Sequence, residues 1–313
     1  MRRSLLTCFA ILVTVGCASS RSASTAMAGP TLARSDTVER LAPEAIPSNE
    51  AFASSLTPDG RTLFFTWAST DRSRLRVMRT RWEGGRWSPP EPTIVADVPR
   101  SMDPHVAPDG SALYYSSPRR REAALGEEGS DWDTWVVSLD ATGTPVGAPR
   151  NAGAPANTTR FEMYPSRTRG GALYYGLYTP DTTERRTLHG IWRSDARGTE
   201  RLAGAVNAAG AGNPYVTPDE RVLIFGSDRA GGRGHGDLWL SVRAADGTWG
   251  EPRNLGPLVN GAETEFCPQL SPDGRYFLFS RSHLGPDGAR TGSDVYVVRV
   301  DAVPVLREAL AQR

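Results

Sequence analysis

The stretch that decides the fold is Ser271-Pro272-Asp273-Gly274, because the same pattern recurs along the chain at intervals of about 50 to 60 residues. The other copies are Thr57-Pro58-Asp59-Gly60, Ala107-Pro108-Asp109-Gly110, Thr217-Pro218-Asp219-Glu220 and, more weakly, Thr168-Arg169-Gly170-Gly171. Proline presets φ at the first corner of such a turn, aspartate tolerates the next position and glycine takes a positive φ. Because Glu220 occupies a glycine position, we expect local strain or a different turn there.

Each turn is followed by a short apolar run and, after a variable loop, by a second one. The first runs are Leu63-Phe64-Phe65, Leu113-Tyr114-Tyr115, Leu173-Tyr174-Tyr175, Leu223-Ile224-Phe225 and Phe277-Leu278-Phe279. Continuous apolar runs suit strands that are buried on both faces, as in stacked sheets. With a strand before each turn and a weaker one at the end of the unit, every repeat supplies four strands, which is one propeller blade. The sequence predicts an all-β, five-bladed β-propeller of four-stranded antiparallel blades, with six blades as the alternative.

The last repeat lacks a convincing fourth strand, and the start of the chain offers one at residues 37–41. Leu41 precedes Phe52 by 11 residues, and Leu255 precedes Phe266 by the same interval. We therefore expect the N-terminal strand to complete the C-terminal blade, because an open ring would leave strand edges unpaired. Residues 303–310 are expected to form a short capping helix.

The N-terminus has the pattern of an export signal. Arg2 and Arg3 precede an apolar run over residues 5–15, which is too short to span a membrane. The run ends in Val15-Gly16-Cys17-Ala18, which resembles the bacterial lipobox and implies acylation of Cys17. The alternative is ordinary secretion with cleavage near residues 26–28. We expect a lipoprotein signal peptide over 1–17, a flexible tether over 18–33 and the propeller over 34–313.

Residues 213–280 carry the most specific motifs, including Asn213-Pro214-Tyr215, Gly236-Asp237-Leu238-Trp239 and Trp249-Gly250-Glu251-Pro252. They resemble the WD40-like (PD40) β-propeller repeat found in the TolB translocation protein and in bacterial envelope proteins. The resemblance covers nearly all of residues 34–300. It implies the propeller and an envelope location, either facing the periplasm or in the outer membrane, and it implies no particular activity.

Composition narrows the range of partners. The chain has 36 basic and 35 acidic side chains, which argues against a nucleic-acid-binding protein. If Cys17 is acylated and Cys8 is removed with the signal, only Cys267 remains, so no intrachain disulfide is expected. We expect a monomer without a metal or other cofactor.

Propeller topology predicts one candidate ligand-binding face. The loops that enter the first strands and the loops between second and third strands lie on the same face of an up-and-down blade, opposite the Pro-Asp-Gly turns. Eight titratable residues fall on these segments: His105, His189, His235, His283, Glu50, Asp103, Glu162 and Glu265. Such residues can contact a ligand or, where they converge, bind a metal or exchange protons. The alternative is that long polar loops merely happen to collect them.

These observations favour a non-catalytic envelope lipoprotein that uses the propeller to bind a protein, peptide or glycan. The alternative is a carbohydrate-active hydrolase or lyase with its site at the propeller mouth. That alternative requires two carboxylates that converge on the central channel. The first strands carry Ser54, His105, Ser166, Tyr215 and Gln269 near their centres, and no acid–base pair is evident among them, so we assign no catalytic residue.

Overall fold

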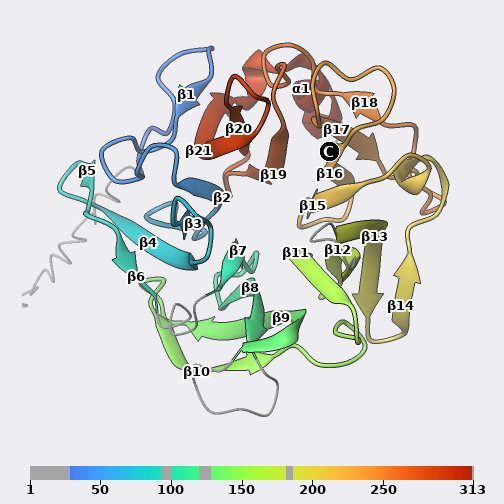
Figure 1. The fold of residues 1–313 in the computed structure, drawn as a ribbon, viewed down its shortest axis with the longest axis horizontal. Coiled ribbons are helices and arrows are strands. Elements are labelled where there is room, and N and C mark those ends of the chain that lie inside the picture. The colour runs from blue at the N-terminus through green and yellow to red at the C-terminus, as the bar shows by residue number, and fades with distance from the viewer. Residues whose placement is uncertain (1–28, 94–99, 120–127, 181–185, 312–313) are drawn as a thin grey trace, which may run out of the picture.

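Five antiparallel sheets surround a central axis in the computed structural model, which describes residues 29–93, 100–119, 128–180 and 186–311 (Figure 1). Blade 1 contains β2 (Ala51–Leu56), β3 (Thr62–Ala68), β4 (Leu75–Glu83), β5 (Arg86–Trp87) and β6 (Glu91–Pro92). Blade 2 contains β7 (Met102–Val106), β8 (Ala112–Arg119), β9 (Glu128–Leu139) and β10 (Pro145–Asn151). Blade 3 contains β11 (Phe161–Arg167), β12 (Leu173–Pro180), β13 (Arg186–Asp195) and β14 (Gly198–Arg201). Blade 4 contains β15 (Gly212–Val216), β16 (Val222–Ser227), β17 (Asp237–Val242) and β18 (Arg253–Asn254).

Blade 5 joins the two ends of the described chain. It contains β19 (Glu265–Leu270), β20 (Tyr276–Leu284), β21 (Arg290–Arg299) and, at its outer edge, β1 (Glu39–Arg40). Glu39 pairs with Val297 and Arg40 with Tyr296, so the N-terminal strand closes the ring. The predicted five-bladed propeller and its mode of closure are both confirmed. Closure covers an edge of β21 that would otherwise expose unpaired backbone groups.

All five repeat turns have the same backbone geometry. The fourth residue donates its N–H to the carbonyl of the first in each turn, as Gly60 does to Thr57 (2.7 Å) and Glu220 does to Thr217 (2.8 Å). The φ of Glu220 is +62°, close to the +67° of Gly60, so the turn type is conserved and the expected strain is present. The weaker copy also forms this turn, because Gly171 donates to the carbonyl of Thr168 (3.1 Å).

The hydrophobic core is divided among the junctions between neighbouring blades. Phe64 and Tyr115 pack together where blade 1 meets blade 2, and Tyr174 packs with Phe225 where blade 3 meets blade 4. These side chains are fully buried because each sheet lies between two others. Fully burying one such ring stabilises the fold by about 1.5–3 kcal/mol. The apolar runs of the sequence are thus explained by packing on both faces.

In three blades, an asparagine side chain forms hydrogen bonds with the backbone at the outer edge of the third strand. Asn157 accepts from the N–H of Thr134 (3.0 Å) and donates to its carbonyl (2.8 Å). Asn260 makes the same pair of bonds to Leu238 (both 2.9 Å), and Asn207 makes it to Ile191 (2.8 and 2.9 Å). These asparagines therefore satisfy backbone groups at the edge of the third strand.

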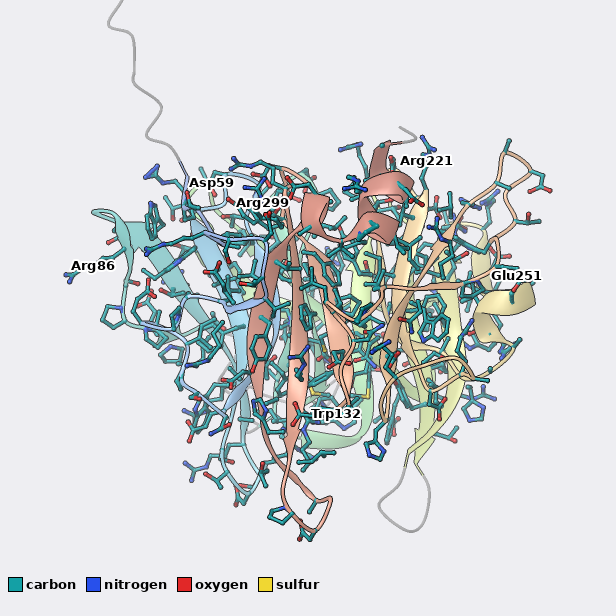
Figure 2. The ribbon with its side chains drawn as sticks, turned by 90° about the horizontal axis from the view of Figure 1, so that it is seen from above. Asp59, Arg86, Trp132, Arg221, Glu251 and Arg299 are labelled. Carbon is teal, nitrogen blue, oxygen red and sulfur yellow. The ribbon has the colours of Figure 1, made fainter. Side chains whose placement is uncertain are left out.

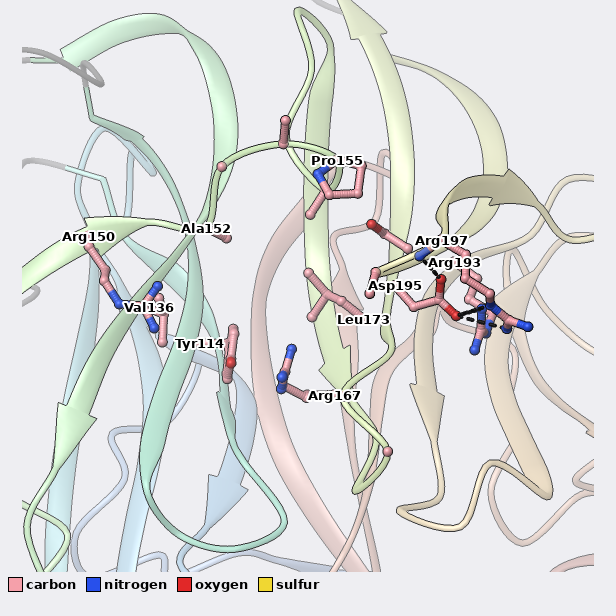
Figure 3. Close-up of a pocket in the computed structure, with 17 residues that line it drawn as sticks. Tyr114, Val136, Arg150, Ala152, Pro155, Arg167, Leu173, Arg193, Asp195 and Arg197 are labelled. Atoms are coloured by element: carbon pink, nitrogen blue, oxygen red, sulfur yellow. Dashed lines mark hydrogen bonds and ion pairs between the residues drawn. The ribbon is translucent and has the colours of Figure 1, made fainter.

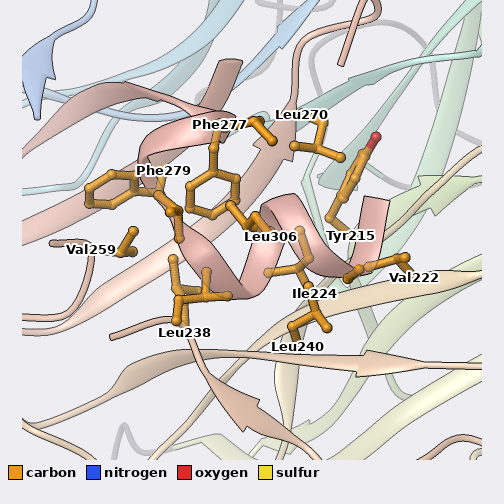
Figure 4. Packing of buried hydrophobic residues seen from close by; sticks show 14 of the residues in the cluster. Tyr215, Val222, Ile224, Leu238, Leu240, Val259, Leu270, Phe277, Phe279 and Leu306 are labelled. Carbon is orange, nitrogen blue, oxygen red and sulfur yellow. The ribbon is translucent and has the colours of Figure 1, made fainter. Parts of the chain in front are cut away.

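The predicted C-terminal helix is α1 (Pro304–Ala311), which follows a short 3₁₀ turn over Val300–Ala302. Leu306 is buried against Phe277, Phe279 and Leu238, so α1 covers the junction of blades 4 and 5 (Figure 4). A second 3₁₀ turn, Gly204–Asn207, leads into blade 4. None of the described helices has the length and apolarity needed to cross a bilayer.

The two ends of the propeller axis differ in the loops they carry. We call the end with the five repeat turns the turn face and the opposite end the mouth face. Figure 2 shows Asp59, in the first turn, and Arg221, directly after the fourth, at one end of the molecule, and Trp132 toward the other. Pro30 and Leu32 line a crevice of about 160 Å³ with the turns of blades 1 and 5, so the described chain begins on the turn face. The predicted signal peptide and residues 18–28 of the tether lie outside the described residues.

Candidate ligand-binding site

A ring of strained residues narrows the centre of the propeller. One residue in each first strand has a left-handed φ of +47° to +58°, although none is glycine: Ala53, Asp103, Tyr164, Asn213 and Cys267. Each lies at a shift in the strand register, and proline follows four of them. The bulge brings these positions to the axis, where they line a narrow cavity of about 30 Å³ that we call the throat. Strain that recurs in every blade is part of the architecture.

The mouth is a cavity of about 880 Å³ above the throat on the mouth face. Three arginines of its lining stack on aromatic rings. The guanidinium carbon of Arg72 lies 5.0 Å from the ring centroid of Phe52, that of Arg100 lies 5.4 Å from Trp132, and that of Arg290 lies 4.7 Å from Phe266. Cation–π contact holds the planar guanidinium groups in place against the aromatic rings.

The described lining of the mouth is rich in arginine. Its described lining contains Arg72, Arg100 and Arg290 and no aspartate or glutamate. The surrounding walls and then the neighbouring charge of Arg72 lower the pKa of Arg290 to about 10. The Arg290 side chain still reaches solvent within the mouth, so it stays protonated at neutral pH. Its charge has no ion-pair partner among the described residues, and the mouth can therefore attract anionic groups.

Of the eight predicted site residues, Asp103 and His105 line the throat. His105 is buried in β7, and its Nε2 accepts the backbone N–H of Arg167 in the next blade (2.9 Å). Burial lowers the pKa of His105 to about 4. A nitrogen that accepts an N–H must be unprotonated, so His105 is a neutral link between blades 2 and 3. Cys267 also lines the throat, and its burial raises the pKa of the thiol, which suits a structural role.

The other three histidines lie apart from one another, in blades 3, 4 and 5. His189 pairs with Thr179 (2.8 Å) in blade 3, and His235 is exposed in a loop of blade 4. His283 contacts Asp294 (2.9 Å) and lies 3.7 Å from Glu263 in blade 5. In the described part of the chain, no three His, Cys, Asp or Glu side chains gather closely enough to hold a metal ion.

Three of the predicted carboxylates, near the starts of first strands, form hydrogen bonds or ion pairs with other residues of the protein. Glu50 accepts from the indole N–H of Trp67 (2.8 Å), and Thr158 donates to the buried carboxylate of Glu162. Glu265 pairs with Arg281 (2.7 Å) and accepts the N–H of Gly261 (3.1 Å). None of the three lines the mouth or the throat, and Asp103 is the only carboxylate in the described lining of either.

The arginines of the mouth were not among the predicted site residues, although a signal for two of them was present. Arg72 lies between the second and third strands of blade 1, and Arg290 begins the third strand of blade 5. The topological rule that placed His189 and His283 on this face places both arginines there as well. The prediction favoured histidine and carboxylate chemistry and passed over arginine, which supplies every basic side chain in this sequence.

Comparison with known proteins supports the fold. No model of a known family matches the chain, and no curated protein is significantly similar to it. The solved structures that resemble it include TolB-like propellers. A putative TolB from Agrobacterium tumefaciens has 15% identity and a TM-score of 0.46 over 81% of this chain and 91% of its own. A protein of unknown function from Dyadobacter fermentans has 12% identity and a TM-score of 0.50 over 85% and 99%. A thermostable family-43 glycoside hydrolase has 12% identity and a TM-score of 0.47 over 80% and 89%. At these identities the likeness concerns the fold alone, and the fold fits a binding or scaffold module.

Proposed function

We propose that this protein is a non-catalytic envelope lipoprotein whose propeller mouth binds a protein, peptide or glycan. The observation that carries the proposal is the mouth itself, a cavity of about 880 Å³ in which three arginines stack on aromatic side chains. Arginine and large aromatic residues dominate the energetics of protein recognition sites. Because bulges of the first strands shape the throat beneath it, the site rests on a rigid scaffold.

The described residues begin on the face where a membrane anchor would leave the mouth accessible. The crevice that contains Pro30 lies on the turn face, opposite the mouth. The twelve residues from Cys17 to Ala28 could extend about 40 Å. A lipid on Cys17 would therefore hold the turn face toward the membrane and leave the mouth open to a partner.

The alternative function, a carbohydrate-active hydrolase or lyase, receives less support from the site. A glycosidase of the usual type places two carboxyl groups on either side of the scissile bond. Glu162 and Glu265 are held by Thr158 and Arg281, away from the cavity lining. Asp103 is the one carboxylate among the described lining residues of the throat. The geometry favours recognition of a ligand over acid–base chemistry.

The mouth is tested by affinity capture from native envelope with three forms of the intact lipoprotein. The first is wild type, the second carries Arg290→Gln in the mouth, and the third carries Arg86→Gln on the outer edge of blade 1. We expect the same partner with wild type and Arg86→Gln, and its loss with the mouth variant at an unchanged melting temperature. Equal capture by all three forms, or turnover of a glycan substrate, contradicts the proposal.

The anchor is tested separately with Cys17→Ala. We expect this variant in the soluble envelope fraction and the wild type in the membrane fraction, with a lipid mass on its N-terminal peptide. An unmodified wild-type N-terminus that begins near residue 29 indicates ordinary secretion instead.

A further inference from the structure

A second cavity, of about 690 Å³, opens on the turn face between blades 2 and 3. We call it the inter-blade cleft. Its floor is apolar and includes Val136 and Leu173, and Tyr114, Arg150 and Arg167 face the open space from the two blades (Figure 3). This cleft lies at the opposite end of the propeller axis from the mouth and shares no lining residue with it.

Arg167 breaks the repeat at the last position of a first strand. The corresponding positions, defined by pairing with the start of the second strand, hold Leu56, Val106, Val216 and Leu270 in the other blades. All four are buried in the core, whereas Arg167 is half-buried in the cleft lining. Gly171, in the divergent third turn, leaves room for it, because a Cβ there would lie 3.3 Å from a terminal nitrogen of Arg167. Blade 3 therefore has a cationic side chain at a position that is apolar and buried in the other four blades.

Charge within the cleft is unbalanced. Asp195 pairs with Arg193 (2.7 Å) and Arg197 (2.9 Å), which accounts for two of the four lining arginines. Arg167 lies over the ring of Tyr114, 5.3 Å from its centroid. Neither Arg150 nor Arg167 forms an ion pair with a described residue. Asp109 is near enough to be influenced by Arg167 but is held by Ser111 (2.7 Å).

Tyr114 contributes a hydroxyl group at the same place. Its ring is buried, and its hydroxyl has no hydrogen-bond partner among the described residues. Burial raises the pKa of Tyr114, while the charges of Arg167 and Arg150 oppose the shift. Arg167 stacks on the ring that carries the hydroxyl, and Arg150 lines the same cleft. A phenol and two guanidiniums offer donors that suit a carboxylate or another oxyanion.

The junction between blades 3 and 4 contains the same kinds of donor, one phenol and two guanidinium groups, around a carboxylate of the chain. Tyr174 occupies in blade 3 the position that Tyr114 occupies in blade 2, since Ser166 pairs with Tyr174 as His105 pairs with Tyr114. The Tyr174 hydroxyl donates to the Glu220 carboxylate (2.7 Å). The same carboxylate accepts from Arg193 (2.7 Å) and lies 3.3 Å from Arg243. Glu220 is the fourth residue of the turn in blade 4, where blade 3 has Gly171.

We infer that the inter-blade cleft binds a carboxylate from outside the chain, held by Arg167, Arg150 and the Tyr114 hydroxyl in the manner in which Glu220 is held at the next junction. The carboxylate belongs either to a small organic acid or to an acidic side chain of a peptide. The apolar floor accommodates the carbon skeleton of either ligand. This site is independent of the mouth and of its proposed ligand.

The test is calorimetric titration of the purified mature protein with succinate, with a triglutamate peptide and with inorganic phosphate, each at constant ionic strength. We expect succinate or the peptide to bind and phosphate to bind more weakly. Tighter binding of succinate identifies a small acid as the ligand class, and tighter binding of the peptide identifies an acidic segment. Absence of binding by both, or a preference for phosphate, contradicts the inference.

Two variants taken from the other repeats locate the binding. Arg167→Leu restores the residue type of the other blades, and Tyr114→Phe introduces the residue that Phe64 supplies in blade 1. Because each charge-assisted hydrogen bond contributes appreciably, we expect Arg167→Leu to weaken binding about tenfold or more and Tyr114→Phe to weaken it less. Arg169→Gln, which removes an exposed turn-face charge outside the cleft, is the matched control. Unchanged affinity in Arg167→Leu, or loss of binding in Arg290→Gln at the mouth, overturns the assignment, and circular dichroism confirms that each variant is folded.

Discussion

The junction between blades 2 and 3 and the junction between blades 3 and 4 share the same architecture and differ in how their polar groups are satisfied. At the second, Glu220 neutralises Arg193 and Arg243 and accepts the Tyr174 hydroxyl, so the chain supplies both donor and acceptor. At the first, Tyr114 and Arg167 face a cleft. A repeated fold can therefore become a binding site by losing one internal acceptor, with no change of backbone.

The two junctions also differ in the link between their first strands. Ser166 accepts the N–H of Val216 (3.0 Å) at the junction of blades 3 and 4. His105 accepts the N–H of Arg167 (2.9 Å) at the junction of blades 2 and 3. A serine hydroxyl does not titrate in the physiological range, whereas an imidazole does. Only the junction that contains the cleft is therefore sensitive to mild acid through this link.

The largest expected effect is acid destabilisation through His105. Its folded-state pKa of about 4 lies below the unfolded value of 6.5, so the unfolded chain binds the extra proton and stability is lost as pH falls through this window. The expected loss is about 2 kcal/mol between pH 7 and pH 5, and about 3 kcal/mol by pH 4. Urea unfolding at pH 7 and pH 5 should show a smaller loss in His105→Gln, and the wild-type loss in the exposed control His235→Gln. Equal losses in all three proteins would remove His105 as the cause.

The second effect concerns Glu220. Burial opposes its ionisation, but hydrogen bonds from Arg193 and Tyr174 outweigh burial and lower its pKa. Glu220→Gln removes one of the carboxylate charges that pair with Arg193, and we expect a loss of about 2 kcal/mol in the free energy of unfolding. Glu308→Gln, which breaks the exposed pair with Arg253, should cost less than about 0.5 kcal/mol. Similar losses in the two variants would show that the Glu220 network contributes no more than a surface pair.

A third effect separates the two tyrosines. Tyr174→Phe deletes the donor to Glu220 and should cost about 1 kcal/mol. Tyr114→Phe deletes a hydroxyl without a partner among the described residues, so its unfolding free energy should stay close to that of the wild type. Chemical denaturation in buffers free of organic acids measures both. A larger loss for Tyr114→Phe would reveal a partner for that hydroxyl and weaken the comparison between the junctions.

The smallest expected effect comes from a variant that gives the junction of blades 3 and 4 the turn residue found at the junction of blades 2 and 3. Glu220→Gly gives the turn the residue that its positive φ favours and removes the carboxylate from Tyr174 and Arg193. Added acetate should then stabilise this variant more than the wild type, by about 0.4 kcal/mol when half of the sites are occupied. Thermal unfolding with acetate, against chloride at the same ionic strength, detects the difference. An identical acetate response in both proteins would mean that the vacated junction does not accept a carboxylate.

The strand order in the sequence was enough to assign several candidate residues to the mouth face. It did not show which other side chains those residues contact. The strand order put His189, His235 and His283 on the mouth face, yet the first and third have partners in their own blades and the second is exposed. Such outcomes depend on side-chain neighbours from elements far apart in the chain. Arg290, which the same topology places at the mouth, became a candidate only when its contact with Phe266 was known.

The sequence by itself determined the number of blades, their strands and the closure of the ring, because turn chemistry and burial on both faces leave a periodic record in residue type. It also recorded Arg167 at a position that is otherwise apolar. Only the tertiary structure decided which charges are neutralised, since Glu220 reaches Arg193 and Tyr174 across a blade junction while no described carboxylate pairs with Arg167. Charge neutralisation depends on the distances between side chains in the folded protein. A repeat pattern gives only the positions of those residues along the chain.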